Sequence, residues 1–315
     1  MWHDIPSNAI SKTTTKQSWK RSPAAFFVIE GEMMTEYKSF YKTVGGNEGS
    51  KCRYSTRLDT YGKGCAHDCS YCYARSLLDF RGLWHPEEPS VADIGRIRRK
   101  VEKLAGSGIT VRLGGMTDCF QPAERRHRVT YKTIRALNEN DVHYLIVTKS
   151  PMVAEDGYLD VMDKGLAHIQ VTVTSTDDGL GRKYEKAPPM SERIRAIEKL
   201  QRNGFDVALR LSPFIPGFID LDRLNAVECD KILVEFLRVN PWIEKWLGMD
   251  CSEWTVKHGG YRHLPLERKI EFMEKISGFR EISVCEDEDE AYGYWKAIVN
   301  HNPDDCCNLR RADDG

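Results

Sequence analysis

Three of the ten cysteines fall in one short stretch, Gly64-Cys65-Ala66-His67-Asp68-Cys69-Ser70-Tyr71-Cys72. This Cys-x3-Cys-x2-Cys spacing supplies three thiolates from a single loop, and thiolates are the ligands that iron–sulfur clusters use. A cubane cluster has four irons, so three protein ligands leave one iron open to a small molecule. Structural zinc is the alternative, with His67 as its fourth ligand, but zinc sites normally show a pair-plus-pair spacing. The stretch therefore predicts a [4Fe–4S] cluster with one open iron.

Further stretches follow the cysteines in a recognisable order. They are Gly114–Glu124 (GGMTDCFQPAE), Val147–Ser150 (VTKS), Tyr184–Pro189 (YEKAPP) with Glu192-Arg193 after it, and Pro213–Gly217 (PFIPG). Together with the cysteine stretch they resemble the radical SAM superfamily, and more narrowly its spore photoproduct lyase branch, often labelled "DNA repair photolyase". The resemblance covers roughly residues 58 to 220. It implies a partial (β/α)6 barrel, a [4Fe–4S] cluster on Cys65, Cys69 and Cys72, and S-adenosyl-L-methionine (SAM) as the second cofactor.

The resemblance also implies which residues contact SAM. Gly114 and Gly115 would meet its amino group, Lys149 its carboxylate, and the hydroxyl of Ser175 or of the neighbouring Thr176 its ribose. The remaining candidates for cofactor binding are Tyr71, Asp118 and Arg210, while Tyr73 is a candidate hydrogen relay. Each position has a plainer alternative: a strand-end turn for the glycines, a solvated strand end for Lys149, strand-end hydrogen bonding for Ser175, helix capping for Asp118, and packing around the cluster for both tyrosines.

Arg210 lies in the apolar segment Val207–Leu211, and a buried arginine requires a partner. Glu185 and the carboxylate of the cofactor are the partners that we consider. Glu124, with Asp118, is a candidate for ordering cofactor or substrate.

Cys119 is the main departure from the pattern of the branch, which often has proline there. Spore photoproduct lyases carry a hydrogen-donating cysteine in the loop after this same strand, but the register differs. As a donor, Cys119 would suit repair of a thymine photoproduct in DNA. An isomerase needs no donor, because 5′-deoxyadenosine returns the hydrogen. We favour the isomerase, acting on a hypermodified thymine as in phage-type DNA modification.

Other functions stay open. The substrate could be tRNA or a peptide, and the chain could instead be a non-catalytic metal-containing protein that binds nucleic acid. Radical SAM chemistry would need an electron donor such as flavodoxin or ferredoxin. Cys306 and Cys307, with the distant Cys251 and Cys285, could hold an auxiliary cluster, although their spacing fits no template; reduced cytosolic thiols are the alternative.

The segments around these residues alternate between short apolar strands and amphipathic helices. We expect strands at Val111–Leu113, Tyr144–Thr148, His168–Thr174 and Val207–Leu211, and helices at Val91–Ala105, Val129–Asn138 and around Ile194, Ile197 and Leu200. This alternation favours βαβ units and a parallel sheet, either curled into a full or partial barrel or doubly wound. In both architectures the chemistry lies at the carboxyl ends of the strands, where most of the candidate residues fall.

The expected fold is therefore α/β, with the partial TIM-type barrel at residues 55–225. Residues 1–54 form an irregular N-terminal segment. Residues 226–315 form a C-terminal extension that completes or caps the active site. We expect this extension to be mostly helical, with helices at Lys231–Val239, Leu266–Ile276 and Glu290–Val299.

The composition of the 315 residues is that of a globular protein, with 41% apolar and 30% charged residues. The formal net charge is −1, so a nucleic-acid partner would have to meet a local basic patch. The longest apolar run, Ala24–Ile29, is too short to span a bilayer, and the first residues lack the pattern of a signal peptide. We therefore expect a cytoplasmic protein without a membrane partner.

Overall fold

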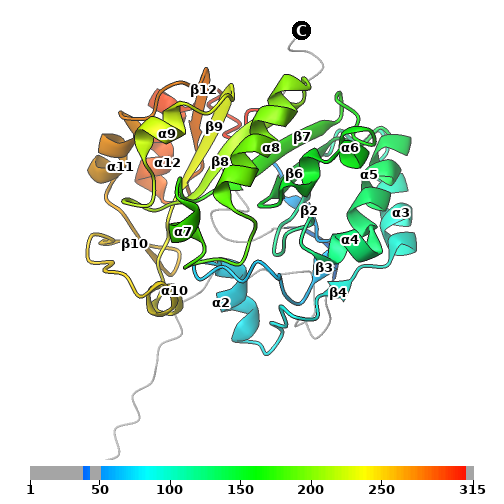
Figure 1. Cartoon of the computed structure of the whole chain (residues 1–315), viewed down its shortest axis with the longest axis horizontal. Coiled ribbons are helices and arrows are strands. Elements are labelled where there is room, and N and C mark those ends of the chain that lie inside the picture. The colour runs from blue at the N-terminus through cyan, green and yellow to red at the C-terminus, as the bar shows by residue number, and fades with distance from the viewer. Residues whose placement is uncertain (1–37, 43–50, 310–315) are drawn as a thin grey trace, which may run out of the picture.

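The computed structural model describes residues 38–42 and 51–309, and its centre is one eight-stranded sheet (Figure 1). The strands lie in the order β1-β2-β5-β6-β7-β8-β9-β12. Neighbours from β2 to β12 pair in parallel, whereas β1 pairs with β2 antiparallel. The bounds are β1 (Phe40–Lys42), β2 (Thr56–Leu58), β5 (Val111–Leu113), β6 (Tyr144–Thr148), β7 (Ala167–Val173), β8 (Asp206–Phe214), β9 (Lys231–Phe236) and β12 (Glu281–Val284).

Helices connect the strands, with α8 lying over β7 and β8 in Figure 1, and two short antiparallel pairs stand apart from the sheet. The helices are α2 (Tyr73–Asp79), α3 (Ile94–Glu102), α4 (Ala123–His127), α5 (Val129–Glu139), α6 (Asp156–Leu159), α7 (Asp178–Gly181), α8 (Met190–Arg202), α9 (Leu221–Asn225), α10 (Pro241–Leu247), α11 (Leu266–Met273) and α12 (Asp289–Tyr294). A 3-10 turn (Pro151–Ala154) and a π-helical turn (Trp295–Val299) complete the set, and the short pairs are β3 (Tyr61–Gly62) with β4 (Ser90–Val91) and β10 (Val256–His258) with β11 (Tyr261–His263).

Burial explains why the central strands and helices form where they do. All seven residues of β7 are buried, because α8 packs against this central strand and the other face points into the interior, where Thr172 lines a cavity. In α8 the residues at helical spacing, including Ile197 and Leu200, are fully buried against the sheet. The mostly parallel sheet with crossover helices confirms the α/β, partial-barrel fold class expected from the sequence.

One element was expected wrongly. Lys231–Val239 does not form a helix; Lys231–Phe236 is strand β9, which pairs with β8 and β12. The run KILVEF is short and rich in apolar residues, and periodicity alone cannot separate a strand buried on both faces from a buried helix. Strands β9 and β12 extend the same sheet beyond residue 225, and the division of the chain at residues 54 and 225 stays a prediction.

The expected irregular character of the N-terminal segment, including the apolar run Ala24–Ile29, falls mostly outside the described residues. In the part that the structure does describe, no helix is both long and apolar enough to cross a membrane.

Candidate functional site

The loop between β3 and α2 carries Cys65, Cys69 and Cys72. Two tight turns shape it, because Asp68 N donates to Cys65 O (3.0 Å) and Cys72 N donates to Cys69 O (3.1 Å). Gly64 enters the loop at φ +145°, where a Cβ would lie 2.3 Å from His85 O, so this position requires glycine. The Cys72 side chain caps α2 by accepting from Arg75 N (3.4 Å). The x3/x2 spacing thus produces a compact loop that presents three sulfurs.

Contacts from elsewhere in the chain hold this loop in place. Asp68 pairs with Arg75 (3.0 Å) at the start of α2 and with Lys186 (3.0 Å). Ser70 N donates to Tyr184 O (2.8 Å), and Lys186 N donates to His67 O (2.7 Å). The Tyr184–Pro189 stretch (YEKAPP) therefore stabilises the position of the cysteine loop.

The three thiols line a cavity of about 220 Å³ at the carboxyl ends of the strands. Burial raises the pKa of Cys65 to about 12 and raises the pKa of Cys69 well above its usual value, and the nearby charge of Lys149 counteracts this rise at Cys69. A buried thiolate is costly without a cation, and metal ligation supplies that cation. His67 lies 3.3 Å from Asp118 through Nε2, so its ring is engaged with a carboxylate. Three thiols from one loop, with His67 engaged by Asp118, fit an iron–sulfur cluster with one open iron.

The glycine pair after β5 forms the adjoining wall of the cavity. Gly114 has φ +83°, and a Cβ there would lie 2.4 Å from Val147 O, so only glycine fits. Asp59, at the end of β2, accepts from Gly115 N (2.7 Å) and Met116 N and thereby fixes the backbone. Burial raises the pKa of Asp59 to about 6 against these hydrogen bonds. Sequence reasoning missed Asp59; its signal is an acidic residue directly after a buried strand.

Asp118 joins the β5 loop to the end of β6. Its carboxylate accepts from Thr148 Oγ1 (2.7 Å), Lys149 N (2.6 Å) and Phe120 N (2.8 Å), and it faces His67. Burial by itself would raise the pKa of Asp118, but His67 and the hydrogen bonds lower it to about 2. Asp118 therefore positions the end of β6, directly before Lys149, which lines the cavity.

Lys149 and the two tyrosines of the cysteine stretch lie around the thiols. Lys149 Nζ is 5.5 Å from the centre of the Tyr71 ring, and the Tyr71 hydroxyl contacts Thr174 Oγ1 (3.4 Å). Tyr73 donates a hydrogen bond to the carbonyl of Gly115. Tyr71, Tyr73, Lys149, Gly114 and Gly115 all line the cavity with the three cysteines, as the predicted cofactor site requires.

The comparisons with known proteins agree with this geometry. The model of the Radical SAM superfamily matches residues 60–229, more than half of the 315 residues. The chain belongs to the radical SAM superfamily. Its cofactors are accordingly a [4Fe–4S] cluster and SAM, and the donor set of Cys65, Cys69 and Cys72 fits that cluster.

The chain spans only part of the curated relatives that it matches. An uncharacterized protein of Methanocaldococcus jannaschii is 25% identical over 168 residues, which is 51% of this chain and 61% of that protein. An uncharacterized protein of Mycobacterium tuberculosis is 27% identical over 179 residues, which is 51% of this chain and 52% of that protein.

Solved structures show the same fold. A mutant spore photoproduct lyase with bound AdoMet and dinucleoside spore photoproduct has a TM-score of 0.55 at 16% identity, covering 71% of this radical SAM chain and 72% of that one. A second mutant of spore photoproduct lyase has a TM-score of 0.57 at 16% identity, covering 73% and 76%.

Three candidates from the sequence lie outside this radical SAM cavity. Cys119 is fully buried in the apolar core beneath the β5 loop, where burial raises the pKa of its thiol well above the usual value. Ser175 donates to Phe218 O (2.8 Å), on the loop before α9. Glu124 is fully buried and accepts from Tyr158 (2.6 Å) and from two backbone N–H groups of α5. Their roles toward substrate or cofactor stay predictions.

Arg210 lines the cavity, but Glu185 is not its partner. Arg210 donates to Gln170 Oε1 (2.8 Å) and to Glu235 Oε2 (2.5 Å), which project from the adjacent strands β7 and β9 on the same face of the sheet. Glu185 instead pairs with the fully buried Arg193 of α8. Since residues 231–239 were expected to form a helix, nothing in the pattern indicated that Glu235 would lie beside Arg210.

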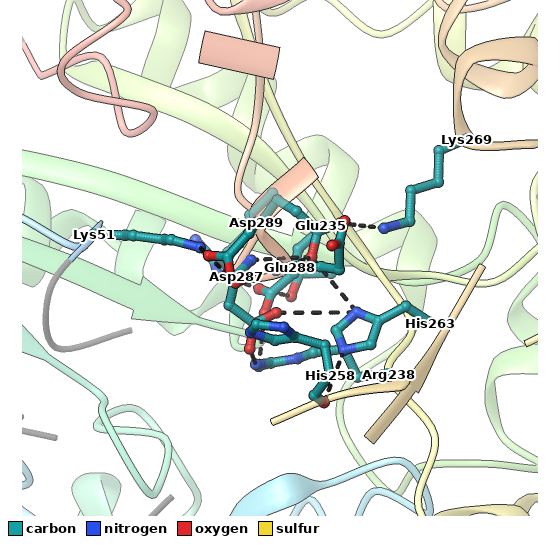
Figure 2. Close-up of polar contacts among 12 residues, drawn as sticks. Lys51, Glu235, Arg238, His258, His263, Lys269, Asp287, Glu288 and Asp289 are labelled. Carbon is teal, nitrogen blue, oxygen red and sulfur yellow. Dashed lines mark hydrogen bonds and ion pairs between the residues drawn. The ribbon is translucent and has the colours of Figure 1, made fainter. Parts of the chain in front are cut away.

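Glu286 and Asp287, which follow β12, line the cavity, and Figure 2 shows Asp287 among its polar partners. Among the described residues, His263, Glu286 and Asp287 are the one group whose metal-ligating atoms all lie within 4.8 Å of one another. Lys269 and Arg238 already neutralise these carboxylates, since Lys269 bonds Glu286 and Arg238 Nη1 lies 2.8 Å from Asp287. The lowered pKa of Glu286, which opposes the effect of burial, comes from His263 and Lys269. We therefore assign this group to an ion-pair network.

Proposed function

We propose that this radical SAM enzyme acts on a thymine-derived group in DNA and rearranges it by abstraction and return of hydrogen. The cavity supports the cofactor half of this proposal, because the three thiols, the glycine pair and Lys149 line it together. When bound, the cluster and SAM supply a 5′-deoxyadenosyl radical, which removes hydrogen from an unreactive carbon. An electron donor such as flavodoxin or ferredoxin would reduce the cluster.

The residues of the chain have separate tasks in this scheme. Lys149 offers a positive charge to the carboxylate of SAM, and the backbone of Gly114 and Gly115 lets the amino group approach closely. Asp59 and Asp118 hold the β5 and β6 loops that carry these groups. Tyr73, bonded to the Gly115 carbonyl, fixes the cysteine loop against the same wall.

An exposed aromatic pair beside the cavity supports a nucleic-acid substrate, and this observation carries the DNA part of the proposal. Phe80, directly after α2, is 78% exposed, and Trp242 of α10 is 48% exposed, with ring centres 6.3 Å apart at an edge-to-face angle. Both helices contribute cavity-lining residues, Ala74 and Ile243, and lie at one end of the sheet in Figure 1. Exposed rings are costly to keep in water, and they are what single-stranded or flipped bases stack on.

A cation lies on the same two helices. The Arg75 guanidinium of α2, which also pairs with Asp68, is 4.4 Å from the centre of the Trp246 ring of α10. A positive charge beside aromatic rings suits a phosphate that follows a stacked base. The solved spore photoproduct lyases include one complexed with a dinucleoside spore photoproduct, which is consistent with a DNA base as substrate in this fold.

The position of Cys119 supports rearrangement over lesion cleavage. A lyase must quench a product radical, and a nearby thiol is the usual hydrogen donor in a side chain. The Cys119 thiol is fully buried and does not line the cavity. Rearrangement needs no such donor, and we therefore propose it first.

Repair of a thymine photoproduct is the second candidate, and one observation favours it. Four other thiols, those of Cys52, Cys285, Cys306 and Cys307, do line the cavity, and a free thiol there could donate hydrogen. Incubation of the reduced enzyme with SAM and ultraviolet-irradiated DNA, followed by mass spectrometry of the digest, separates the candidates. Loss of photoproduct with thymine restored supports the lyase, whereas an isomer of a modified base in unirradiated DNA supports the rearrangement.

The aromatic pair provides the test of the DNA part. Phe80→Ala with Trp242→Ala should weaken DNA binding about tenfold or more, because stacking contributes about 1–3 kcal/mol per base. Cleavage of SAM without DNA should not change. Ile298→Ala is the matched control, since Ile298 is 68% exposed but lies on the C-terminal π-helical turn. Equal DNA binding by the double variant and the control would contradict a role for this surface.

A further inference from the structure

Four cysteines from three segments that are far apart in the sequence line the same cavity. Cys52, Cys285, Cys306 and Cys307 all line it, and all ten cysteines of the chain are free. Cys52, Cys285 and Cys306 pack against one small buried cluster that contains Cys307. Tyr54, Leu145 and Leu233 surround the group with apolar side chains.

Specific contacts bring the three segments together. Lys51 Nζ donates to Asp287 O (2.7 Å) and Asp289 Oδ1 (2.6 Å), which places Cys52 beside the end of β12, as Figure 2 shows for Lys51. Tyr54 donates to Asp305, and Asp305 in turn accepts from Cys307 N (3.1 Å). Cys285 N donates to Val234 O (2.8 Å) and so keeps that cysteine on the edge of β9. The fold thus fixes each segment by contacts of its own.

The surroundings of these thiols favour an anionic occupant. Arg112 and Arg210 line the cavity together with these thiols, and Arg210 is already paired with Glu235. Arg112 Nε is buried and has no hydrogen-bond partner among the described residues. A buried donor without an acceptor is costly unless something else in the cavity accepts from it. The sulfides of an iron–sulfur cluster are such acceptors, and four thiolates give the cluster a net negative charge.

We propose that Cys52, Cys285, Cys306 and Cys307 bind a second, auxiliary [4Fe–4S] cluster. Four thiolates ligate all four irons, so this cluster has no open iron and does not bind SAM. A single zinc ion would gather its ligand atoms closely, whereas in a cubane each thiolate binds its own iron. None of these thiols belongs to the one group of described side chains whose ligand atoms all lie within 4.8 Å. The same is true of Cys65, Cys69 and Cys72, so both sets fit a cubane better than a single ion.

The structure also corrects the set of cysteines considered from the sequence. Cys251 is buried in the main apolar core and its thiol contacts Met249 O (3.6 Å), away from the other three. Cys52 takes its place, from a segment more than 200 residues earlier in the chain. With the four thiols bound to iron, none of them is a hydrogen donor, which removes the observation that favours the lyase.

The experiment measures iron and sulfide in protein that is purified and reconstituted without oxygen. The wild-type chain should hold about eight irons and eight sulfides, four for each cluster. A variant with Cys65→Ala, Cys69→Ala and Cys72→Ala should keep about four irons. After reduction it should give an electron paramagnetic resonance signal that SAM does not alter. The reciprocal variant, Cys52→Ala with Cys285→Ala, should keep about four irons and a signal that SAM does alter.

Cys251→Ala with Cys229→Ala is the matched control, because both thiols are buried outside the cavity, and this variant should keep about eight irons. About four irons in wild-type protein, or none in the triple variant while its circular dichroism matches that of the control, would overturn the proposal. One zinc per chain in the triple variant would also overturn it. None of these results depends on the DNA substrate, so failure of the proposed function leaves this test intact.

Discussion

The two cysteine groups of the cavity are assembled in opposite ways. Cys65, Cys69 and Cys72 come from one loop whose own turns set the sulfur positions. Cys52, Cys285, Cys306 and Cys307 come from three segments that meet through tertiary contacts: Cys285 N bonds to β9, Lys51 bonds Asp287 after β12, and Tyr54 bonds Asp305. The spacing of the first group predicts its ligands directly, whereas for the second group the sequence indicated three candidates, added Cys251 wrongly and missed Cys52. The number of ligands differs too: three leave an iron open for SAM, and four leave none.

The largest expected effect is the loss of SAM cleavage when the first cysteine group loses one ligand. Cys65→Ala should abolish the formation of 5′-deoxyadenosine from SAM, because the loop loses one of three ligands and has no substitute. Cys251→Ala should keep full activity, since that thiol lies in the apolar core. Chromatography with mass spectrometry of the reduced reaction measures the product. Substantial 5′-deoxyadenosine from Cys65→Ala would contradict the assignment of the catalytic cluster to this loop.

Asp59, which fixes the glycine pair beside the cysteine loop, should make the stability of the folded chain depend on pH. The pKa of Asp59 in the folded chain is raised to about 6, above its value of 3.8 when exposed. A carboxyl group with a raised folded-state pKa destabilises the fold as pH rises from about 4 through 6, because ionisation then costs more in the folded chain than in the unfolded one. Between pH 4 and pH 7, this group should lower the free energy of unfolding by about 2 kcal/mol.

The comparison of wild-type apo-protein with Asp59→Asn isolates that effect. The variant loses hydrogen bonds and is less stable at pH 4, but its deficit relative to wild type should shrink by pH 7. Urea unfolding at the two pH values measures both. A deficit that does not change with pH would show that Asp59 does not titrate as described.

Measurement of SAM binding separates the role of the open iron from that of the charge on Lys149. Lys149→Ala should weaken SAM binding about tenfold, because it removes a charged partner of the carboxylate, about 1.4 kcal/mol. The cluster spectrum should stay unchanged, since Lys149 ligates no iron. Lys186→Ala is the control, because Lys186 is exposed and pairs with Asp68 on the outside of the cysteine loop. Equal affinities of the two variants for SAM would mean that Lys149 is only a solvated strand end.

Cys119→Ala should have the smallest effect. The thiol is buried away from the cavity, so activity on the true substrate should fall by less than twofold, with a loss of stability of about 1 kcal/mol. In an isomerisation, SAM consumption should stay below one equivalent per product. If the variant instead stalls after SAM cleavage, or yields adducts of the DNA base with solvent or dithionite, Cys119 is the donor and the lyase is the correct function.

The sequence predicted what depends on local pattern. The cysteine loop, the glycine pair and Lys149 all line the cavity, and strands β5 and β6 have the predicted bounds. Relations between distant residues could not be predicted. Glu235 became the partner of Arg210 only because KILVEF is a strand beside β8, and a short apolar run does not distinguish strand from helix. Asp59 and Cys52 likewise gain their places from segments that are distant in the sequence.

Transfer of deuterium from substrate to cofactor tests the central claim most directly. The reduced enzyme is incubated with SAM and DNA whose thymine-derived groups carry deuterium on the carbon attached to the ring. Hydrogen abstraction with return predicts deuterium at the 5′ carbon of the recovered SAM and 5′-deoxyadenosine, together with an isomerised base. Formation of 5′-deoxyadenosine without deuterium in either molecule would contradict the claim that this cavity directs the radical at a thymine-derived group in DNA.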